Sequence, residues 1–133
     1  YMRYAEVLLI YAEAMAMQDK LTEALEALNE VRDRVDLPAV SASTKTEFMK
    51  LLRHERMVEL AFEGHRFWDV RRWKEGDKHF KNIVEMKITK NGDDIYTYER
   101  KVKERSWDDK MYFFPIPQSE KSKNPNLEQN PGW

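Results

Sequence analysis

The chain has 133 residues, of which 41% are apolar and 35% are charged, and its formal net charge is −1. This length fits a single domain with a real core, and the balanced charge gives no electrostatic attraction to nucleic acid or to anionic lipid. No apolar stretch approaches the roughly 18 residues that span a membrane, and the absence of cysteine excludes disulfides, thiolate metal sites and cysteine nucleophiles.

Two helices are predicted at the start of the chain, over residues 1–18 and 21–35, because apolar side chains recur there at helical spacing. The connection is short, so the two helices must pack antiparallel, as in one tetratricopeptide-like helix pair. In the first helix the predicted apolar face has small alanines alongside it that permit close helix contact. Its larger residues are Tyr4, Leu8, Tyr11 and Met15.

A third, long helix is predicted after the break at Leu37-Pro38. Thr44 and Glu47 have the spacing of a capping box, and Gly64 suits a left-handed helix end, so this helix should run to Glu63. A short helix over residues 65–73 should follow, closed by Gly76.

The remaining chain predicts a small β-hairpin and a tail. Residues 83–90 and 95–103 flank the turn sequence 91–94, which suits a hairpin. The segment 107–114 is either another strand or an irregular packed segment. From Pro115 onward, four prolines within 17 residues predict an extended tail that wraps over the surface.

Three carboxylates on the third helix, Glu55, Glu59 and Glu63, share the side that carries its apolar stripe from Phe48 to Phe62. Burying an ionised carboxylate on an apolar stripe costs free energy unless it is paired with a cation, so these residues form either a buried ion network or a functional site. A buried ion network is favoured, with three arginines of the next segment as the expected counter-ions. These are Arg66, Arg71 and Arg72.

Enzymatic chemistry finds no positive support in the sequence. A two-metal site in a helical bundle requires Glu-x-x-His motifs, and the sequence has none. The arginines next to the glutamates of the third helix would lower the pKa of those carboxyl groups, whereas the general acid of a glycosidase needs a raised pKa. The three histidines lack metal-binding spacing, and neither a serine elbow nor a phosphate-binding glycine loop is present. We therefore predict no catalytic, cofactor-binding or metal-binding residue.

Aromatic side chains are the remaining candidates for ligand contact, because they stack on the apolar faces of sugar rings. Phe67, Trp68 and Trp73 are expected to fill the core beneath the ion network. The candidates for sugar contact lie in the hairpin and the segment after it, although packing competes with ligand contact for each. They are Tyr96, Tyr98, Trp107 and Tyr112.

Four separated motifs follow one another along the chain. They are RYAEVLLIYAEA with ALEALNEVR near the start, ERMVELAFEGHRFWDVRRW in the middle, YFFPIP from Tyr112, and the closing NP…QNPGW. In this order they resemble the C-terminal part of the SusD/RagB family. This resemblance covers nearly the whole chain, and it implies the C-terminal portion of a longer protein. We expect one domain, residues 1–133, with helices over about 1–76 and the hairpin and tail over about 77–133.

The resemblance implies a nutrient-uptake lipoprotein on the surface of the outer membrane, anchored by an N-terminal lipid that this chain lacks. Such a protein binds an oligosaccharide without catalysis and partners a SusC-like TonB-dependent transporter. A structural module that docks on the transporter, or on the N-terminal region, is the alternative, and a glycoside hydrolase is the least favoured reading. No family motif assigns a sugar-binding residue to this sequence.

Overall fold

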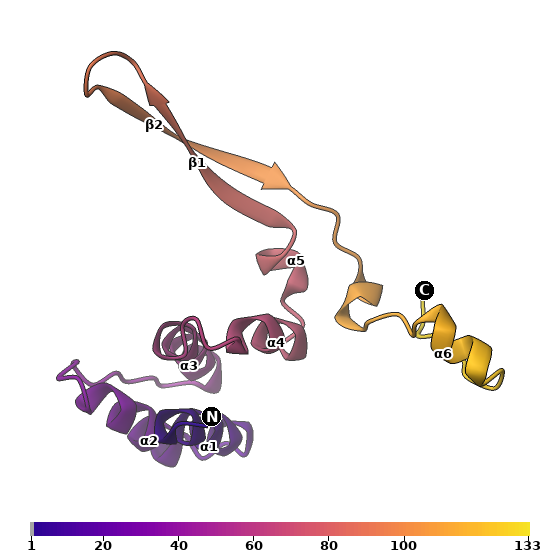
Figure 1. Ribbon diagram of the computed structural model, residues 1–133. Helices are drawn as coiled ribbons and strands as arrows, with labels where there is room; N and C mark the ends of the chain where they lie inside the picture. Colours follow the sequence, from indigo (N-terminus) through magenta and orange to yellow (C-terminus); the bar gives the residue numbers. More distant parts are fainter. Residues whose placement is uncertain (1) are drawn as a thin grey trace. The chain divides into compact units, whose positions relative to one another are not determined.

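The computed structural model describes residues 2–133, which divide into two compact units between Phe67 and Trp68. The fold is mainly helical with one two-stranded antiparallel sheet, as predicted (Figure 1). Whether the two units behave as one domain stays a prediction. Within the described residues, no helix is long and apolar enough to cross a membrane.

The first unit contains α1 (Tyr4–Met17), α2 (Leu21–Asp33) and α3 (Lys45–Glu59), with α1 packed against both of the others (Figure 1). Asp19, with φ +61°, forms the tight connection that turns α2 back along α1. The core is made of alanines and larger apolar side chains from all three helices. Its fully buried members are Leu9, Ala12, Ala24, Leu28, Phe48 and Leu52.

The predicted apolar face of α1 was wrong in part. The side that enters the core carries Leu9 and three alanines, whereas Tyr4 and Tyr11 are 68% and 45% exposed. Small side chains let α1 approach α2 and α3 closely, and this close approach leaves no room for the tyrosine rings between the helices. The tyrosines therefore lie on the outer side of the pair.

The start of α3 matches its prediction and its end does not. The Glu47 amide donates to the Thr44 hydroxyl at 3.2 Å, and the Glu47 carboxylate accepts from the Thr44 amide at 3.2 Å. The helix ends at Glu59, one turn earlier than expected, and Phe62 lies in a left-handed conformation (φ +64°) with its ring fully exposed. Gly64 has the predicted left-handed φ, +82°.

The second unit starts within α4 (His65–Arg72) and continues through α5 (Gly76–His79) into the hairpin. Strand β1 (Asn82–Lys90) pairs with β2 (Tyr96–Glu104) along its whole length, from Asn82 opposite Glu104 to Lys90 opposite Tyr96. The turn between them uses Gly92, whose φ of +127° favours glycine. The hairpin prediction is confirmed: β1 starts one residue earlier than predicted, and β2 is shifted by one residue toward the C-terminus.

Of the two alternatives predicted for residues 107–114, the structure shows the irregular segment, which contains a short 3₁₀ helix (Asp109–Tyr112). The tail differs from its prediction, because it contains α6 (Gln118–Lys123) and is not extended throughout. Pro117 stands just before α6, where a missing backbone N–H costs nothing. The Gln129 amide then bonds both backbone groups of Ile116, at 2.7 and 3.0 Å, so the tail folds back on itself.

Candidate functional site

The carboxylates of α3, and Glu63 just after it, are held by arginines from the start of the chain and from α2. Glu55 is 8% exposed, and the Arg32 guanidinium donates to it at 2.5 Å while also donating to the carbonyl of Pro38. Arg3 donates to both Glu59 and Glu63, at 2.9 and 2.6 Å. These carboxylates therefore belong to an ion network that ties α3 to the rest of the first unit.

The expected counter-ions of this network were wrong in part. Arg34 adds a third cation, donating to both oxygens of Glu59 at 3.0 Å. Arg3 and Arg34, the partners of Glu59, therefore lie just before α1 and just after α2. Arg72 does neutralise Asp69, at 2.8 Å, as predicted. Glu59 thus pairs with arginines that are distant in the sequence, and not with the nearby arginines that were expected.

The electrostatics of this network do not favour acid catalysis. The hydrogen bond from Arg3 lowers the pKa of Glu63, and the same bonds to Glu63 and Glu59 raise the pKa of Arg3. A carboxyl group that acts as a general acid near neutral pH needs a raised pKa instead. Within residues 2–133, no three histidine or acidic side chains gather in a way that could hold a metal ion.

The four candidate sugar contacts fall into two pairs on different elements. Tyr96 and Tyr98 lie on one face of β2, 45% and 66% exposed, and the Lys90 ammonium lies 6.0 Å from the Tyr96 ring. Trp107 and Tyr112 are half-buried and contact each other edge to face, with ring centroids 5.2 Å apart. The structure thus groups Trp107 with Tyr112, and Tyr96 with Tyr98.

Trp107 is a packing residue that supports Tyr112. Its ring stacks against Phe80 at 5.2 Å and lies so close to Gly76 that a β-carbon there would be 1.9 Å from it. The Gly76 amide donates to the Tyr112 hydroxyl at 3.0 Å. Glycine is therefore required at position 76, because the Trp107 ring leaves no space for a β-carbon there. The Trp107 ring and the Gly76 amide together hold the Tyr112 side chain in place.

Tyr112 also lines an open pocket of about 570 Å³ in the second unit, which we call the Tyr112 pocket. Its walls combine aromatic rings with charged groups. The lining residues are Trp68, Arg71, Arg72, Lys74, Asp109, Tyr112 and Phe113. Arg71 is held by a bond to the Met111 carbonyl and lies 4.8 Å from the Phe114 ring.

Sequence reasoning missed three residues of this pocket, Lys74, Asp109 and Phe113, and it placed a fourth, Trp68, wrongly. Trp68 was expected in the core, but it is 59% exposed, because the buried positions of α4 are Asp69 and Val70. Phe67 is likewise 39% exposed. Lys74 and Asp109 carried no signal in the sequence beyond their residue types, and Phe113 stood out only as part of the YFFPIP motif.

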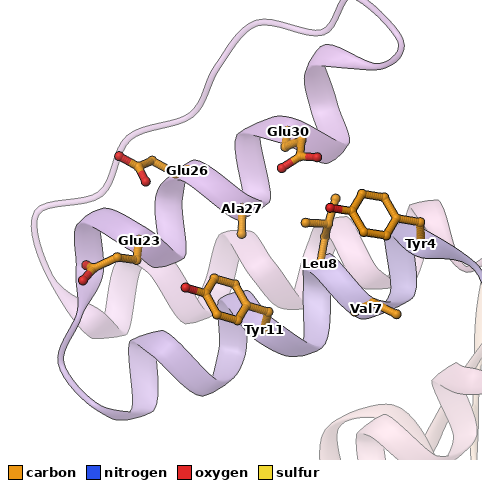
Figure 2. Close-up of a pocket in the computed structure, with 8 residues that line it drawn as sticks. All are labelled: Tyr4, Val7, Leu8, Tyr11, Glu23, Glu26, Ala27 and Glu30. Atoms are coloured by element: carbon orange, nitrogen blue, oxygen red, sulfur yellow. The ribbon is translucent and has the colours of Figure 1, made fainter.

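A second hollow, about 450 Å³, runs between α1 and α2 on the first unit, and we call it the α1–α2 groove (Figure 2). One wall is apolar and comes from α1, and the other carries three carboxylates of α2. The lining residues are Tyr4, Val7, Leu8, Tyr11, Glu23, Glu26, Ala27 and Glu30. In Figure 2 the Tyr4 ring lies near Glu30 and the Tyr11 ring lies toward Glu23.

Comparison with known proteins places this fold in one family. The family model described as "SusD family" matches residues 1–133. The SusD-like protein P2 of Formosa agariphila is 32% identical over 99% of this chain and 25% of its own length. The SusD-like protein P38 of the same organism is 38% identical over 51% of this chain and 15% of its own length.

Solved structures agree with this assignment. A SusD-like protein from Bacteroides fragilis superimposes with a TM-score of 0.85 at 36% identity, over 99% of this chain and 25% of that protein. A SusD superfamily protein from Parabacteroides distasonis gives a TM-score of 0.62 at 26% identity, over 98% of this chain and 26% of that one. The chain thus spans about a quarter of the length of the relatives that it matches throughout. On the match across all of its residues, the chain belongs to the SusD family.

Proposed function

We propose that this chain is part of a protein that captures oligosaccharides at the surface of the outer membrane and passes them to a TonB-dependent transporter. The observation that carries the proposal is the family match over residues 1–133, together with the TM-score of 0.85 to a SusD-like protein. A lipid anchor outside residues 1–133 would hold the protein at the membrane. The relatives extend well beyond the matched region, so the activity of the whole protein rests on more than these residues.

Within this chain, we propose the Tyr112 pocket as the surface that contacts sugar. Its volume of about 570 Å³ is in the range of small-molecule sites, roughly 300–1,000 Å³. Trp68 and Phe113 are 59% and 62% exposed, so their rings are available for stacking on sugar C–H faces. Lys74 and Asp109 offer a donor and an acceptor for hydroxyl groups beside those rings.

Tyr96 and Tyr98 are the second candidate surface for sugar. Both rings are exposed on the same side of β2, where a sugar chain could lie along the strand. Trp107 is proposed as a supporting residue only, because its ring packs on Phe80 and Gly76. Catalysis is not proposed, because the lowered pKa of Glu63 is unsuited to a general acid and the neighbouring carboxylates are paired with arginines.

Isothermal titration calorimetry with plant, host and microbial oligosaccharides tests the proposal, with the same samples assayed for new reducing ends. We expect saturable heat without cleavage. Trp68→Ala should weaken that binding about tenfold, since stacking interactions contribute on the order of 1 kcal/mol each. Phe62→Ala is the matched control, because Phe62 is a fully exposed ring outside the pocket.

Three other results would count against parts of the proposal. New reducing ends would overturn the absence of catalysis. Binding that Trp68→Ala leaves unchanged, but that a Tyr98→Ala variant weakens, would move the sugar contact to the hairpin. No heat from a folded sample would favour the alternative, a framework module that docks on the transporter or on the rest of the protein.

A further inference from the structure

The wall of the Tyr112 pocket carries more positive than negative charge. The charged lining residues are Arg71, Arg72, Lys74 and Asp109. Both arginines have partners in the protein, because Arg71 donates to the Met111 carbonyl and Arg72 pairs with Asp69. Lys74 differs from them, because its ammonium makes no hydrogen bond or ion pair with any residue from 2 to 133.

Lys74 also has an unusual backbone conformation, with φ at +54°. It lies two residues after the end of α4, where its amide donates to the Arg71 carbonyl at 3.0 Å and the Glu75 amide donates to the Val70 carbonyl at 2.9 Å. These two bonds form a Schellman motif, whose left-handed position is usually occupied by glycine and sometimes by asparagine. A lysine there is strained, because its β-carbon crowds the carbonyl oxygen that follows. The chain thus places a charged side chain where glycine would fit with less strain.

Strained backbone positions cluster at ligand sites, where the surrounding structure holds a side chain in the required place. Lys74 combines such a position with a charge that no described residue neutralises, beside the exposed rings of Trp68 and Phe113. A neutral sugar offers this ammonium only hydroxyl groups, whereas a carboxylate or sulfate on the sugar supplies a counter-ion and a stronger hydrogen bond. Asp109 would repel such an anionic group, so the group is directed to Lys74.

We propose that Lys74 makes the Tyr112 pocket selective for acidic oligosaccharides, which carry a carboxylate or sulfate group. The sugar rings would stack on Trp68 and Phe113, and the anionic group would pair with the Lys74 ammonium. This inference rests on the sugar contact proposed above for the same pocket. It adds the class of sugar and the residue that selects it.

The test is the affinity of the intact chain for two matched pairs of sugars, measured by isothermal titration calorimetry at low salt. One pair is an oligogalacturonide and its methyl ester, which differ in the charge of the carboxyl groups. The other pair is a sulfated carrageenan oligosaccharide and its desulfated form, so the two pairs distinguish a carboxylate from a sulfate. We expect the charged member of at least one pair to bind about fivefold more tightly, and added salt to reduce this difference.

Lys74→Gln should remove the preference for the charged sugar and leave the affinity for the neutral sugar almost unchanged. Lys74→Gly should also remove the preference, and it should raise the melting temperature by a few degrees, because glycine relieves the strain of the left-handed backbone. Lys50→Gln is the matched control for charge, because Lys50 is an exposed lysine of α3 outside the pocket. Asp36→Gly is the matched control for strain, because Asp36 has a similar φ of +56° outside the pocket, so sugar affinity should not change.

The possible failures are distinguishable. Binding of both members of each pair without preference for the charged one would overturn this inference and leave the proposed sugar contact standing. A preference that Lys74→Gln retains, or that Lys50→Gln reduces equally, would assign it to another cation or to net charge alone, and would overturn the role of Lys74. A lower melting temperature for Lys74→Gly would make this lysine a structural residue, which also overturns that role. Binding of no sugar by a folded chain would overturn both this inference and the sugar contact on which it rests.

Discussion

The two best-defined carboxylates of α3 differ in how deeply their partners are buried, and this difference predicts different costs of removal. The side chains of Glu55 and Arg32 are 10% and 17% exposed, so Glu55→Ala would leave a cation in a poorly hydrated place. We expect it to lower the free energy of unfolding by about 3 kcal/mol. Glu59→Ala should cost only about 1–2 kcal/mol, because its partners Arg3 and Arg34 are 39% and 56% exposed and can be hydrated.

Urea denaturation followed by circular dichroism measures this ranking. Glu120→Ala serves as the reference, because the side chains of Glu120 and Lys123 are 51% and 72% exposed and their pair should contribute almost nothing. Equal losses for Glu55→Ala and Glu59→Ala would mean that burial does not control the strength of this network. Glycan affinity, where present, should not change in any of the three variants.

The Arg3–Glu63 ion pair makes the stability of the folded chain depend on pH in the acidic range. The pKa of Glu63 is lowered by the hydrogen bond from Arg3, so the folded state holds this carboxylate ionised more strongly than the unfolded state does. The contribution is fully present above the unfolded pKa, about 4.3, and is lost as pH falls through the lower folded pKa. The matching contribution from the raised pKa of Arg3 is lost only at strongly alkaline pH.

Melting temperatures of the parent chain and of Glu63→Gln, recorded from pH 7 to pH 3, test this expectation. The parent should be more stable at pH 7, and the difference should shrink below about pH 4.3. A difference that grew toward pH 3 would reverse the sign and refute the pairing. High salt should reduce the difference at pH 7, because both groups lie at the surface.

The existence of the ion network could be predicted from the sequence, but its partners could not. A carboxylate on an apolar stripe must be paired, and that requirement is visible at Glu55 and Glu59. The sequence offers the adjacent Arg66 to Arg72 as the nearest cations, whereas the bond from Arg3 to Glu63 joins residues 60 apart. Only the packing of α1 against α3 brings them together, and pattern alone does not determine that packing.

At the scale of single elements, the capping box at the start of α3 is the feature that depends most on one side chain. Thr44→Ala removes the hydroxyl that accepts from the Glu47 amide, and we expect a loss of about 1 kcal/mol in unfolding free energy. Ser43→Ala is the control, because only the backbone amide of Ser43 bonds to Glu47. Equal effects of the two substitutions in urea denaturation would mean that the cap does not contribute to stability.

Local signals predicted where elements begin better than where they end or which side they bury. The capping box and the hairpin turn depend on residues only a few positions apart, so both could be identified from the sequence. The end of α3 at Glu59 could not, because the left-handed backbone at Phe62 is adopted by a residue that rarely takes it. Four prolines likewise concealed α6, which fits between Pro117 and Pro125.

At the scale of the whole molecule, the family could be predicted from the order of four motifs, but the candidate surfaces could not. The Tyr112 pocket joins α4 to the segment around residue 112, and the α1–α2 groove requires that the tyrosines of α1 lie outside the core. Periodicity placed those tyrosines in the core, because it measures only which residues share a face. Which face of α1 is buried depends on the volume of its side chains, because alanines fit between the closely packed helices and tyrosine rings do not.

The burial pattern also predicts how stability varies along the chain. The core lies in α1, α2 and α3, whereas every residue of β2 is exposed and the apolar face of the hairpin has no cover among the described residues. That face carries Val84, Met86, Ile88, Tyr98 and Val102, and the opposite face is charged. A two-stranded hairpin with an uncovered apolar face is marginally stable in water.

Amide hydrogen exchange should therefore be slowest in the central turns of α1, α2 and α3, and faster by orders of magnitude in β1 and β2, although the ladder bonds of the hairpin are complete. The reason is that exchange requires local opening, and opening the hairpin exposes almost no additional apolar surface. Tyr98→Ser should change hairpin exchange only slightly, while Leu28→Ala should accelerate exchange throughout the first unit, because Leu28 is fully buried. Protection in β2 equal to that in α2 would contradict this ranking, and it would mean that another surface covers the apolar face of the hairpin in solution.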